Sequence, residues 1–269
     1  MHPVLFKIGA FELRSYGLML ALSFVLGVWF TAYRAKKQNI KTGIVFDLSL
    51  IIIVTSIVGA RFMYVIFHID EFRGRWLDTI NPVQSSGEIG LSGMTVIGGF
   101  VLAVICSLLY LSLKKQPVLK IADLFAPSVA LGIFITRIGC YLNGCCYGKT
   151  CAPALGVVFP SNSPAGFVFS QQPIIPTQLY SSLYGMLIFF ILILAEKKFR
   201  RFDGFSFFLL FTLYGIARFI IDFFRYYEHS MVLINIGTVS FSVNQGISLL
   251  LATLFGGLFL QRIHKTKPE

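Results

Sequence analysis

The residues in this sequence best suited to do chemistry are three arginines that lie inside long apolar stretches. They are Arg61, Arg137 and Arg218. An arginine at the centre of a bilayer costs at least about 2.5 kcal/mol, so it persists only where it faces a bundle interior or a wet cavity. We therefore expect these side chains to point into a helical bundle.

Arg218 has an acidic neighbour four residues further along, Asp222, and Arg225 follows one turn later. Residues four apart share a helix face, so Arg218 and Asp222 are expected to meet. One interpretation is an ion pair that only neutralises charge. The other is that Asp222 orients Arg218 toward an anion. We favour the second, because a further arginine is available on another apolar stretch.

That further arginine begins the stretch Arg137-Ile-Gly-Cys-Tyr-Leu-Asn143-Gly144-Cys-Cys-Tyr-Gly148. Glycines allow sharp turns and close approach of the backbone, and Asn-Gly is a turn signal. An arginine beside glycine-rich backbone and an asparagine amide is typical of an oxyanion or phosphate cradle. Helix packing through small residues could explain the glycines, but it leaves the arginine unexplained.

Other polar or small residues cluster near the same ends of the apolar stretches. Gly98 and Gly99 open one stretch, where they suit either a ligand head group or tight helix packing. Tyr64 and His68 share the helix face of Arg61. His68 and His229 could each act as a general base or be ordinary solvated histidines. Tyr16 suits a membrane-interface anchor at least as well as a catalytic group.

Four of the five cysteines form one group with the spacing C-x4-C-C-x4-C: Cys140, Cys145, Cys146 and Cys151. This is not a common zinc spacing, and no histidine lies nearby in the sequence. We expect a disulfide or plain packing, with a redox-active thiol and a metal site as alternatives. The prediction for metal and for cofactors is none.

The composition explains where such residues must lie. Of the 269 residues, 56% are apolar and only 13% are charged, far below the level of soluble domains. The formal net charge of +11 could suggest nucleic acid. We exclude that function, because the basic residues form short clusters between apolar runs, as membrane topology requires.

A spanning helix needs about 20 mostly apolar residues, and seven stretches qualify. The predicted fold is an all-α polytopic membrane protein, a single domain over residues 1–269. The stretches are Tyr16–Tyr33, Ile44–Phe67, Thr95–Leu113, Ile121–Leu142, Thr177–Ala195, Gly204–Phe224 and Phe241–Leu260.

The distribution of Lys and Arg predicts the orientation. Most of them lie in the first, third and fifth connections and in the C-terminal tail, which places these in the cytoplasm. The N-terminus is then outside, and the long segments 68–94 and 143–176 form an outer cap. The absence of an inverted repeat disfavours a transporter.

Together these motifs resemble the prolipoprotein diacylglyceryl transferase family over nearly the whole chain and in the family's order. The signature is Arg137-Ile-Gly-x-x-x-Asn143-Gly144-x-x-x-Gly148. The other matching motifs are Tyr16-Gly-Leu-Met19, Arg61 with Tyr64, Gly98-Gly99, Asp123-Leu-Phe-Ala-Pro127, Pro176-Thr-Gln178-Leu-Tyr180, Arg218-Phe-Ile-Ile-Asp222-Phe-Phe-Arg225, and Gln245 with Ser248.

The resemblance implies an enzyme of lipoprotein biosynthesis in the bacterial cytoplasmic (inner) membrane. It would move the diacylglyceryl group of phosphatidylglycerol to the lipobox cysteine of a prolipoprotein signal peptide, forming a thioether and releasing glycerol 1-phosphate. We expect a monomer with no nucleic-acid partner. The predicted catalytic residues are Arg137, Arg218 and Tyr16. The predicted phosphatidylglycerol-binding residues are Arg137, Arg218, Asn143, Gly144, Gly98, Gly99, Arg61, Asp222 and Gln178.

The chain departs from the family pattern at several positions. The family usually has a histidine before the glycine pair, where this chain has Ile97. Cys140 and Cys145 stand where many members have Asn and Glu. Either another group activates the thiol, such as Tyr16 or His68, or the chain is a divergent paralog. Such a paralog would bind anionic phospholipid or modify another acceptor; a transporter is the weakest alternative.

Overall fold

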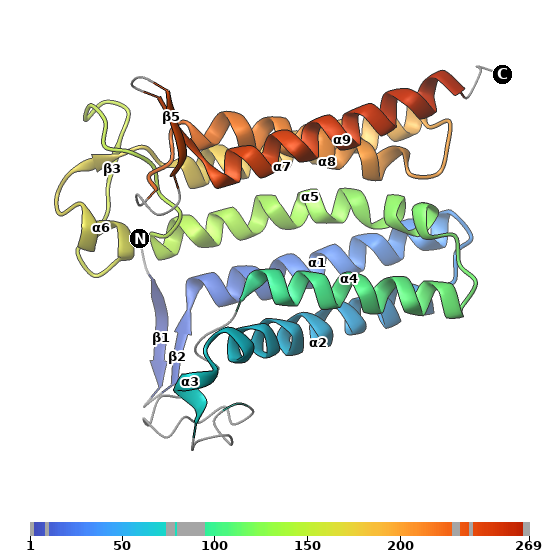
Figure 1. Cartoon of the computed structure of the whole chain (residues 1–269), viewed down its shortest axis with the longest axis horizontal. Helices are drawn as coiled ribbons and strands as arrows, with labels where there is room; N and C mark the ends of the chain where they lie inside the picture. Colours follow the sequence, from blue (N-terminus) through green and yellow to red (C-terminus); the bar gives the residue numbers. More distant parts are fainter. Residues whose placement is uncertain are drawn as a thin grey trace. The chain divides into compact units, whose positions relative to one another are not determined.

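The computed structural model of the chain describes residues 3–8, 11–73, 79, 95–227, 232–236 and 239–265. Contacts divide the chain into two compact units: Met1–Thr31 with Leu119–Glu269, and Ala32–Val118. Figure 1 follows the chain through its helices and short strands. The single membrane domain expected from the sequence stays a prediction.

Seven long apolar helices are present among the described residues, as the sequence predicted. They are α1 (Ser15–Lys37), α2 (Thr42–Phe67), α4 (Val96–Leu113), α5 (Val118–Asn143), α7 (Thr177–Phe199), α8 (Phe205–Asp222) and α9 (Val243–Lys265). Their lengths of 18 to 26 residues correspond to about 27 to 39 Å at 1.5 Å per residue, enough to cross a bilayer.

Three helices run several residues past their predicted C-terminal ends. The last turns of α1, α7 and α9 hold the basic residues Lys36, Lys197 and Arg262 and their neighbours. Positive charge stabilises a helix C-terminus, and long basic side chains can reach the membrane interface from there. The apolar runs alone therefore underestimated these helices.

The helices carry apolar side chains outward and small polar ones inward. Trp29, Phe62 and Leu194 are each about two thirds exposed, at 65%, 65% and 66%. Thr31 and Ser128 are buried and share a 2.6 Å hydrogen bond between their hydroxyls. This distribution is the reverse of a water-soluble protein, and it agrees with a bilayer as the surrounding solvent.

In the unit Ala32–Val118, α2 and α4 pack through glycines. A Cβ at Gly98 would collide with the Met63 side chain and the Gly59 carbonyl, and one at Gly99 would lie 2.6 Å from the Ser56 oxygen. The short helix α3 (Ile69–Phe72) follows α2. The expected outer segment 68–94 lies mostly outside the described residues.

In the other unit, α5, α7 and α8 share a core. Its buried members are Ala126, Ala130, Ile188, Leu192 and Leu210. Figure 1 shows α7, α8 and α9 running together along this unit. Close approach is again made by glycine: a Cβ at Gly185 would lie 2.8 Å from the Phe134 nitrogen of α5.

The N-terminus of α8 is capped by a carboxylate from α5. Asp123 is 1% exposed and accepts hydrogen bonds from the backbone N–H groups of Gly204, at 2.7 Å, and Phe207, at 2.9 Å. The first N–H groups of a helix have no partner within the helix, so a side-chain acceptor stabilises them. The Asp123-Leu-Phe-Ala-Pro127 motif thus joins two spans.

Short strands and a second short helix lie outside the spans. They are the hairpins β1 (Val4–Ile8) with β2 (Phe11–Arg14) and β5 (Val232–Ile236) with β6 (Val239–Ser242), the pair β3 (Val157–Val158) with β4 (Pro173–Ile174), and α6 (Pro164–Val168). The predicted outer segment 143–176 contains β3, α6 and β4. Phe159, Ala165 and Ile174 form its small core.

We predict that Asp123→Ala lowers the free energy of unfolding by about 1–3 kcal/mol, because two buried N–H groups lose their acceptor. Thermal unfolding in detergent micelles measures this. The matched control is Asp203→Ala, whose side chain is 53% exposed. Equal melting temperatures for the two variants would contradict the capping role.

We also predict that Gly98→Ala destabilises the protein by at least about 1–3 kcal/mol, because the added methyl group forces α2 and α4 apart. The control is Gly43→Ala, near the start of α2. Its new Cβ would have nothing within 4 Å, so the free energy of unfolding should not change. The same unfolding measurement applies. A stable Gly98→Ala protein that has lost only lipid binding would instead assign this glycine to a ligand.

Candidate functional site

Arg137 lies near the C-terminal end of α5, where α1 approaches closely. A Cβ at Gly139 would lie 2.9 Å from the Met19 Cβ, so α1 and α5 touch through this glycine. The contact brings Tyr16, at the start of α1, within electrostatic reach of Arg137. Two of the three predicted catalytic residues therefore lie in the same region of the structure.

Arg137 is half-buried and makes no ion pair with a carboxylate among the described residues. The groups that interact with its charge are the phenols of Tyr184 on α7 and Tyr214 on α8 and the thiols of Cys140 and Cys146. A guanidinium held this way keeps its positive charge available. Such a group suits an incoming anion.

Arg218 and Asp222 form the expected ion pair on α8, with 3.2 Å between Nη2 and Oδ1. Both are buried, at 9% and 4% exposure. Arg218 Nη2 also donates to the Tyr227 hydroxyl at 3.0 Å. Arg218 Nη1 is buried and has no hydrogen-bond partner within the described chain. The pair thus fixes one side of the guanidinium and leaves a donor unused on the other.

Tyr184 links the two arginines. Its phenol interacts electrostatically with both Arg137 and Arg218, and its ring makes an edge contact with Tyr214 at 6.2 Å between centroids. Reasoning from the sequence assigned no role to Tyr184, Tyr214 or Tyr227. For Tyr184 and Tyr214, the available signal was a phenol within an apolar span.

The third signature glycine ties the loop after α5 to the end of α8. Gly148 N–H donates to the Ile175 carbonyl at 3.1 Å, and Lys149 N–H donates to the Phe224 carbonyl at 2.9 Å. A Cβ at Gly148 would lie 2.6 Å from the Ile175 oxygen, so only glycine fits between these carbonyls. Arg225 lies beside this junction, with its buried Nε unpartnered in the part of the chain described.

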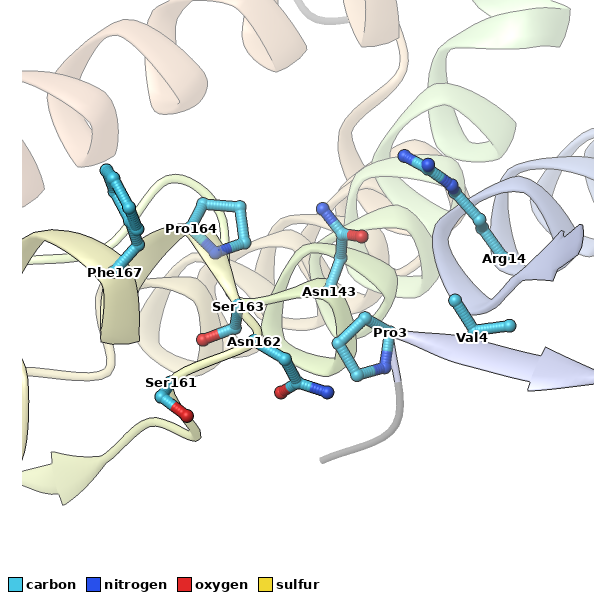
Figure 2. Close-up of a pocket in the computed structure, with 9 residues that line it drawn as sticks. All are labelled: Pro3, Val4, Arg14, Asn143, Ser161, Asn162, Ser163, Pro164 and Phe167. Atoms are coloured by element: carbon cyan, nitrogen blue, oxygen red, sulfur yellow. The ribbon is translucent and has the colours of Figure 1, made fainter.

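Asn143 and Gly144 form the turn that ends α5. Gly144 has φ +75°, a left-handed conformation that favours glycine, and its carbonyl accepts from Ala165 N–H at 3.0 Å. Asn143 lines a pocket of about 470 Å³. Figure 2 shows that Arg14 from the end of β2, Asn162 from the loop before α6, and Phe167 from α6 also line it.

Gln178, which the sequence predicted to bind phosphatidylglycerol, contacts the signature loop; the predicted role stays a prediction. It is fully buried, and its Nε2 donates to the Cys145 carbonyl at 2.8 Å. The neighbouring Thr177 hydroxyl donates to the Cys146 carbonyl at 3.0 Å. Gln178 Oε1 has no partner among the described residues. These two side chains hold the signature loop against α7.

All five cysteines are free thiols, so of the two expected outcomes, a disulfide or plain packing, the disulfide is not formed. The Sγ atoms of Cys140, Cys145 and Cys146 converge and all lie within 4.8 Å of one another. Hydrogen bonds from the thiols of Cys140 and Cys145, together with the charge of Arg137, lower the pKa of Cys146. Cys151 is outside this group.

Arg61, Gly98 and Gly99 belong to the unit Ala32–Val118, and Arg137 belongs to the other unit. Arg61 is 6% exposed, donates from Nε to the Thr79 carbonyl at 3.0 Å, and lies over the Phe72 ring at 5.1 Å. Gly98 and Gly99 pack against α2, in agreement with tight helix packing, one of the two interpretations of this pair from the sequence. Ile97, at the position where a histidine is usual, is 68% exposed.

Of the two histidines proposed as general bases, the structure describes only His68. His68 is exposed, and its ring stacks on Tyr64 at 4.2 Å between centroids. His229 lies outside the described residues. Tyr16, the other group proposed to activate a thiol, lies within electrostatic reach of Cys140, Cys145 and Cys146.

Comparison with known proteins gives one consistent result. The profile of the family described as prolipoprotein diacylglyceryl transferase matches residues 3–261. A Clostridium tetani protein named phosphatidylglycerol–prolipoprotein diacylglyceryl transferase is 33% identical over 270 residues, covering 100% of both chains. A Clostridium perfringens protein of that name, numbered 2, is 30% identical, covering 99% of this chain and 97% of its own length. A Prochlorococcus marinus protein of the same name is 30% identical over 73% of this chain and 67% of its own.

Proposed function

The chain belongs to the prolipoprotein diacylglyceryl transferase family, and on that basis we propose how its residues carry out the family's reaction. The enzyme transfers the diacylglyceryl group of phosphatidylglycerol to the thiol of a lipobox cysteine in a prolipoprotein. A sulfur–carbon bond forms at the glycerol carbon, the bond from that carbon to the phosphate oxygen breaks, and glycerol 1-phosphate leaves.

The observation that carries the proposal is that Arg137 and Arg218 both interact electrostatically with Tyr184. Negative charge grows on the departing phosphate as the carbon–oxygen bond breaks. Fixed donors in a low-dielectric site stabilise such charge without reorganisation, and one donor is commonly worth 10²–10³ in rate. Arg137, which has no carboxylate partner among the described residues, and the unused Nη1 of Arg218 are suited to this task.

Asp222 acts as a positioning residue in this proposal. Its carboxylate holds Arg218 from one side, and its Oδ2 accepts a 3.4 Å hydrogen bond from Ser242 at the start of α9. Tyr227 holds the same guanidinium nitrogen. A side chain fixed by two groups loses little entropy on binding phosphate, so its binding energy is available to the transition state.

The turn at Asn143 and Gly144 supports the polar end of the lipid. Asn143 offers an amide beside a pocket of about 470 Å³ that Arg14 also lines (Figure 2). We assign this pocket to the glycerol of the phosphatidylglycerol head group, which needs hydroxyl partners rather than charge. We propose that Tyr16 contacts the lipid between its glycerol head group and the phosphate at Arg137.

Arg61 and the Gly98–Gly99 pair have a weaker claim to the lipid. Arg61 is engaged with an aromatic ring and a backbone carbonyl, and the glycines serve helix packing. A role for them in phosphatidylglycerol binding is retained only as a secondary proposal.

We also propose that the enzyme acts as a monomer, because the proposed reaction uses residues of one chain.

One observation favours a second function. Ile97 replaces the usual histidine, and it cannot accept a proton from a thiol. A divergent paralog that binds anionic phospholipid, or that modifies another acceptor, would tolerate this change. The two functions differ in one product: only the first yields a diacylglyceryl thioether on a lipobox peptide.

The seven apolar helices and the bacterial relatives indicate a multi-pass protein of the bacterial inner membrane. We propose further that the N-terminus is outside and the C-terminus cytoplasmic. The basic last turns of α1, α7 and α9 support this orientation, since cytoplasmic segments near spans are rich in Lys and Arg.

The central test incubates purified protein with phosphatidylglycerol and a lipobox peptide and reads the peptide mass. We expect a diacylglyceryl adduct that is absent when the peptide cysteine is replaced by serine. Arg137→Ala should lower the rate at least about 100-fold, and Arg137→Lys should fall between, because lysine keeps the charge but not the planar fork.

Lys197→Ala, at an exposed position in the last turn of α7, is the matched loss of a positive charge and should leave the rate unchanged. All variants must show wild-type thermal unfolding in micelles. Normal transfer by a folded Arg137→Ala protein would overturn the assignment of this arginine. No adduct from the wild type would favour the paralog.

Orientation is predicted separately with fusions at the C-terminus of the full chain. A green fluorescent protein fused there should fluoresce and an alkaline phosphatase should be inactive, because the first folds in the cytoplasm and the second requires the periplasm. An active phosphatase fusion would reverse the proposed orientation and leave the proposed reaction untouched.

A further inference from the structure

The convergence of three thiols is the feature that the reaction has not yet used. Cys140 ends the buried face of α5, and Cys145 and Cys146 lie in the loop that follows. Their Sγ atoms all lie within 4.8 Å of one another. Sulfur atoms that share one tetrahedral zinc ion, with bonds of about 2.3 Å, lie about 3.8 Å apart. The three thiols are therefore close to the spacing that one such ion requires.

The loop is built to hold this arrangement. Thr177 and Gln178, both buried on α7, donate to the carbonyls of Cys146 and Cys145 at 3.0 and 2.8 Å. Cys146 itself has φ +59°, a left-handed conformation that costs a non-glycine residue about 1–3 kcal/mol. Strain of this kind persists only where the surroundings enforce it. Here it accompanies the placement of a third sulfur beside the other two.

Positive charge surrounds the cluster. Arg137 and Arg225 both interact electrostatically with Cys146. Three thiolates around a divalent ion carry a net charge of −1, and a fourth thiolate makes it −2. Two arginines can balance that charge inside the membrane, where an unbalanced one would be costly. Without a metal ion, three thiolates would repel one another, and the two arginines would reduce that repulsion less than a metal ion placed between the sulfur atoms.

We propose that Cys140, Cys145 and Cys146 bind one zinc ion, whose fourth coordination position takes the thiol of the lipobox cysteine. This rests on the proposed function, and it deepens it by naming what activates the thiol. Zinc sites with three protein ligands keep one position for water or substrate. The sequence led us to expect no metal, because the spacing is unusual and no histidine is near.

The step balances without a further reactant. On binding, the lipobox thiol loses its proton to water, because a thiol that coordinates zinc is deprotonated. The sulfur then attacks the glycerol carbon, and the electron pair of the carbon–oxygen bond leaves with the phosphate that Arg137 and Arg218 hold. Zinc undergoes no redox change, and the thioether, a weaker ligand, is replaced by water.

The inference also accounts for the departures in the signature. Ile97 removes the usual histidine, and Cys140 and Cys145 appear where many family members have Asn and Glu. A metal that ionises the substrate thiol makes a histidine base unnecessary. The loss of the histidine and the gain of the two cysteines would then belong to one change of mechanism, from a histidine base to a metal ion.

The first test measures metal in the full-length protein purified without chelator. We expect about one zinc per chain in the wild type and in Cys151→Ser, a matched loss of a thiol outside the cluster. Cys146→Ser should lose zinc, and Cys146→His should retain it, because histidine is also a zinc ligand. Cadmium added to the zinc-free wild type should give the ultraviolet absorption of sulfur–cadmium bonds, and added to Cys146→Ser it should not.

Zinc equally absent from the wild type and Cys146→Ser, with no cadmium absorption, would overturn the inference. So would a disulfide between two of the three cysteines found by mass in the active protein. These readouts do not depend on transfer activity. They also do not require the serine variant to fold, because the wild type and the histidine variant carry the comparison.

The second test measures transfer by zinc-free and zinc-reloaded wild type at several pH values. A free thiol with a pKa of about 8.5 is only about 3% ionised at pH 7, so zinc removal should cost about 30-fold there and less than about twofold at pH 9. Reloading should restore the neutral-pH rate. Full activity at pH 7 without zinc would overturn the role of the metal while leaving the proposed function standing. Bound zinc with no transfer at any pH would overturn both the role of the metal and the proposed reaction. The assignment of the three cysteines as zinc ligands would still stand.

Discussion

The structure depends on keeping guanidinium charge inside an apolar helical bundle. Each buried arginine meets this requirement differently. Arg218 has a carboxylate and a phenol, and Arg61 has a carbonyl and an aromatic ring. Arg137 has no carboxylate partner among the described residues, only phenols and thiols. Such a charge is costly without an anion, so in the proposed reaction the phosphate of the lipid would stabilise the bundle when it binds, which couples lipid binding to the site that acts on it.

Much of the fold could be predicted because a bilayer imposes simple rules on a sequence. The length of apolar runs gave all seven helices, and the four-residue spacing gave the Arg218–Asp222 pair. The rules fail where contacts join distant segments. Tyr184 interacts electrostatically with two arginines from other helices, and Gln178 donates a hydrogen bond to a backbone carbonyl 33 residues away, which no local pattern reveals. The hairpins were missed because apolar periodicity does not mark strands this short.

The signature stretch illustrates how one segment can carry several constraints at once. Gly139 allows α1 to approach, Gly144 turns the chain, and Gly148 passes between two carbonyls. These three glycines set the path of the backbone, and the residues between them are then placed with little freedom. The sequence indicated a phosphate cradle here, but it could not indicate that Cys140, Cys145 and Cys146 end on the same side of that path. The conformation of Cys146, which is rare for a residue with a side chain, decides this.

The reaction itself limits where a thiol can be activated. A displacement at carbon requires the entering sulfur and the leaving oxygen on opposite sides of the carbon. The group that binds the sulfur must therefore lie across the glycerol carbon from the arginines that hold the phosphate, yet close enough to share one water-poor space. A cluster within electrostatic reach of Arg137, and built into the same signature stretch, meets the second condition. The His68 ring is exposed and stacks on Tyr64, so the surrounding water weakens any electrostatic help it could give to a thiol. In the proposed reaction, the cysteine-rich signature is part of the reacting centre rather than a structural clasp beside it.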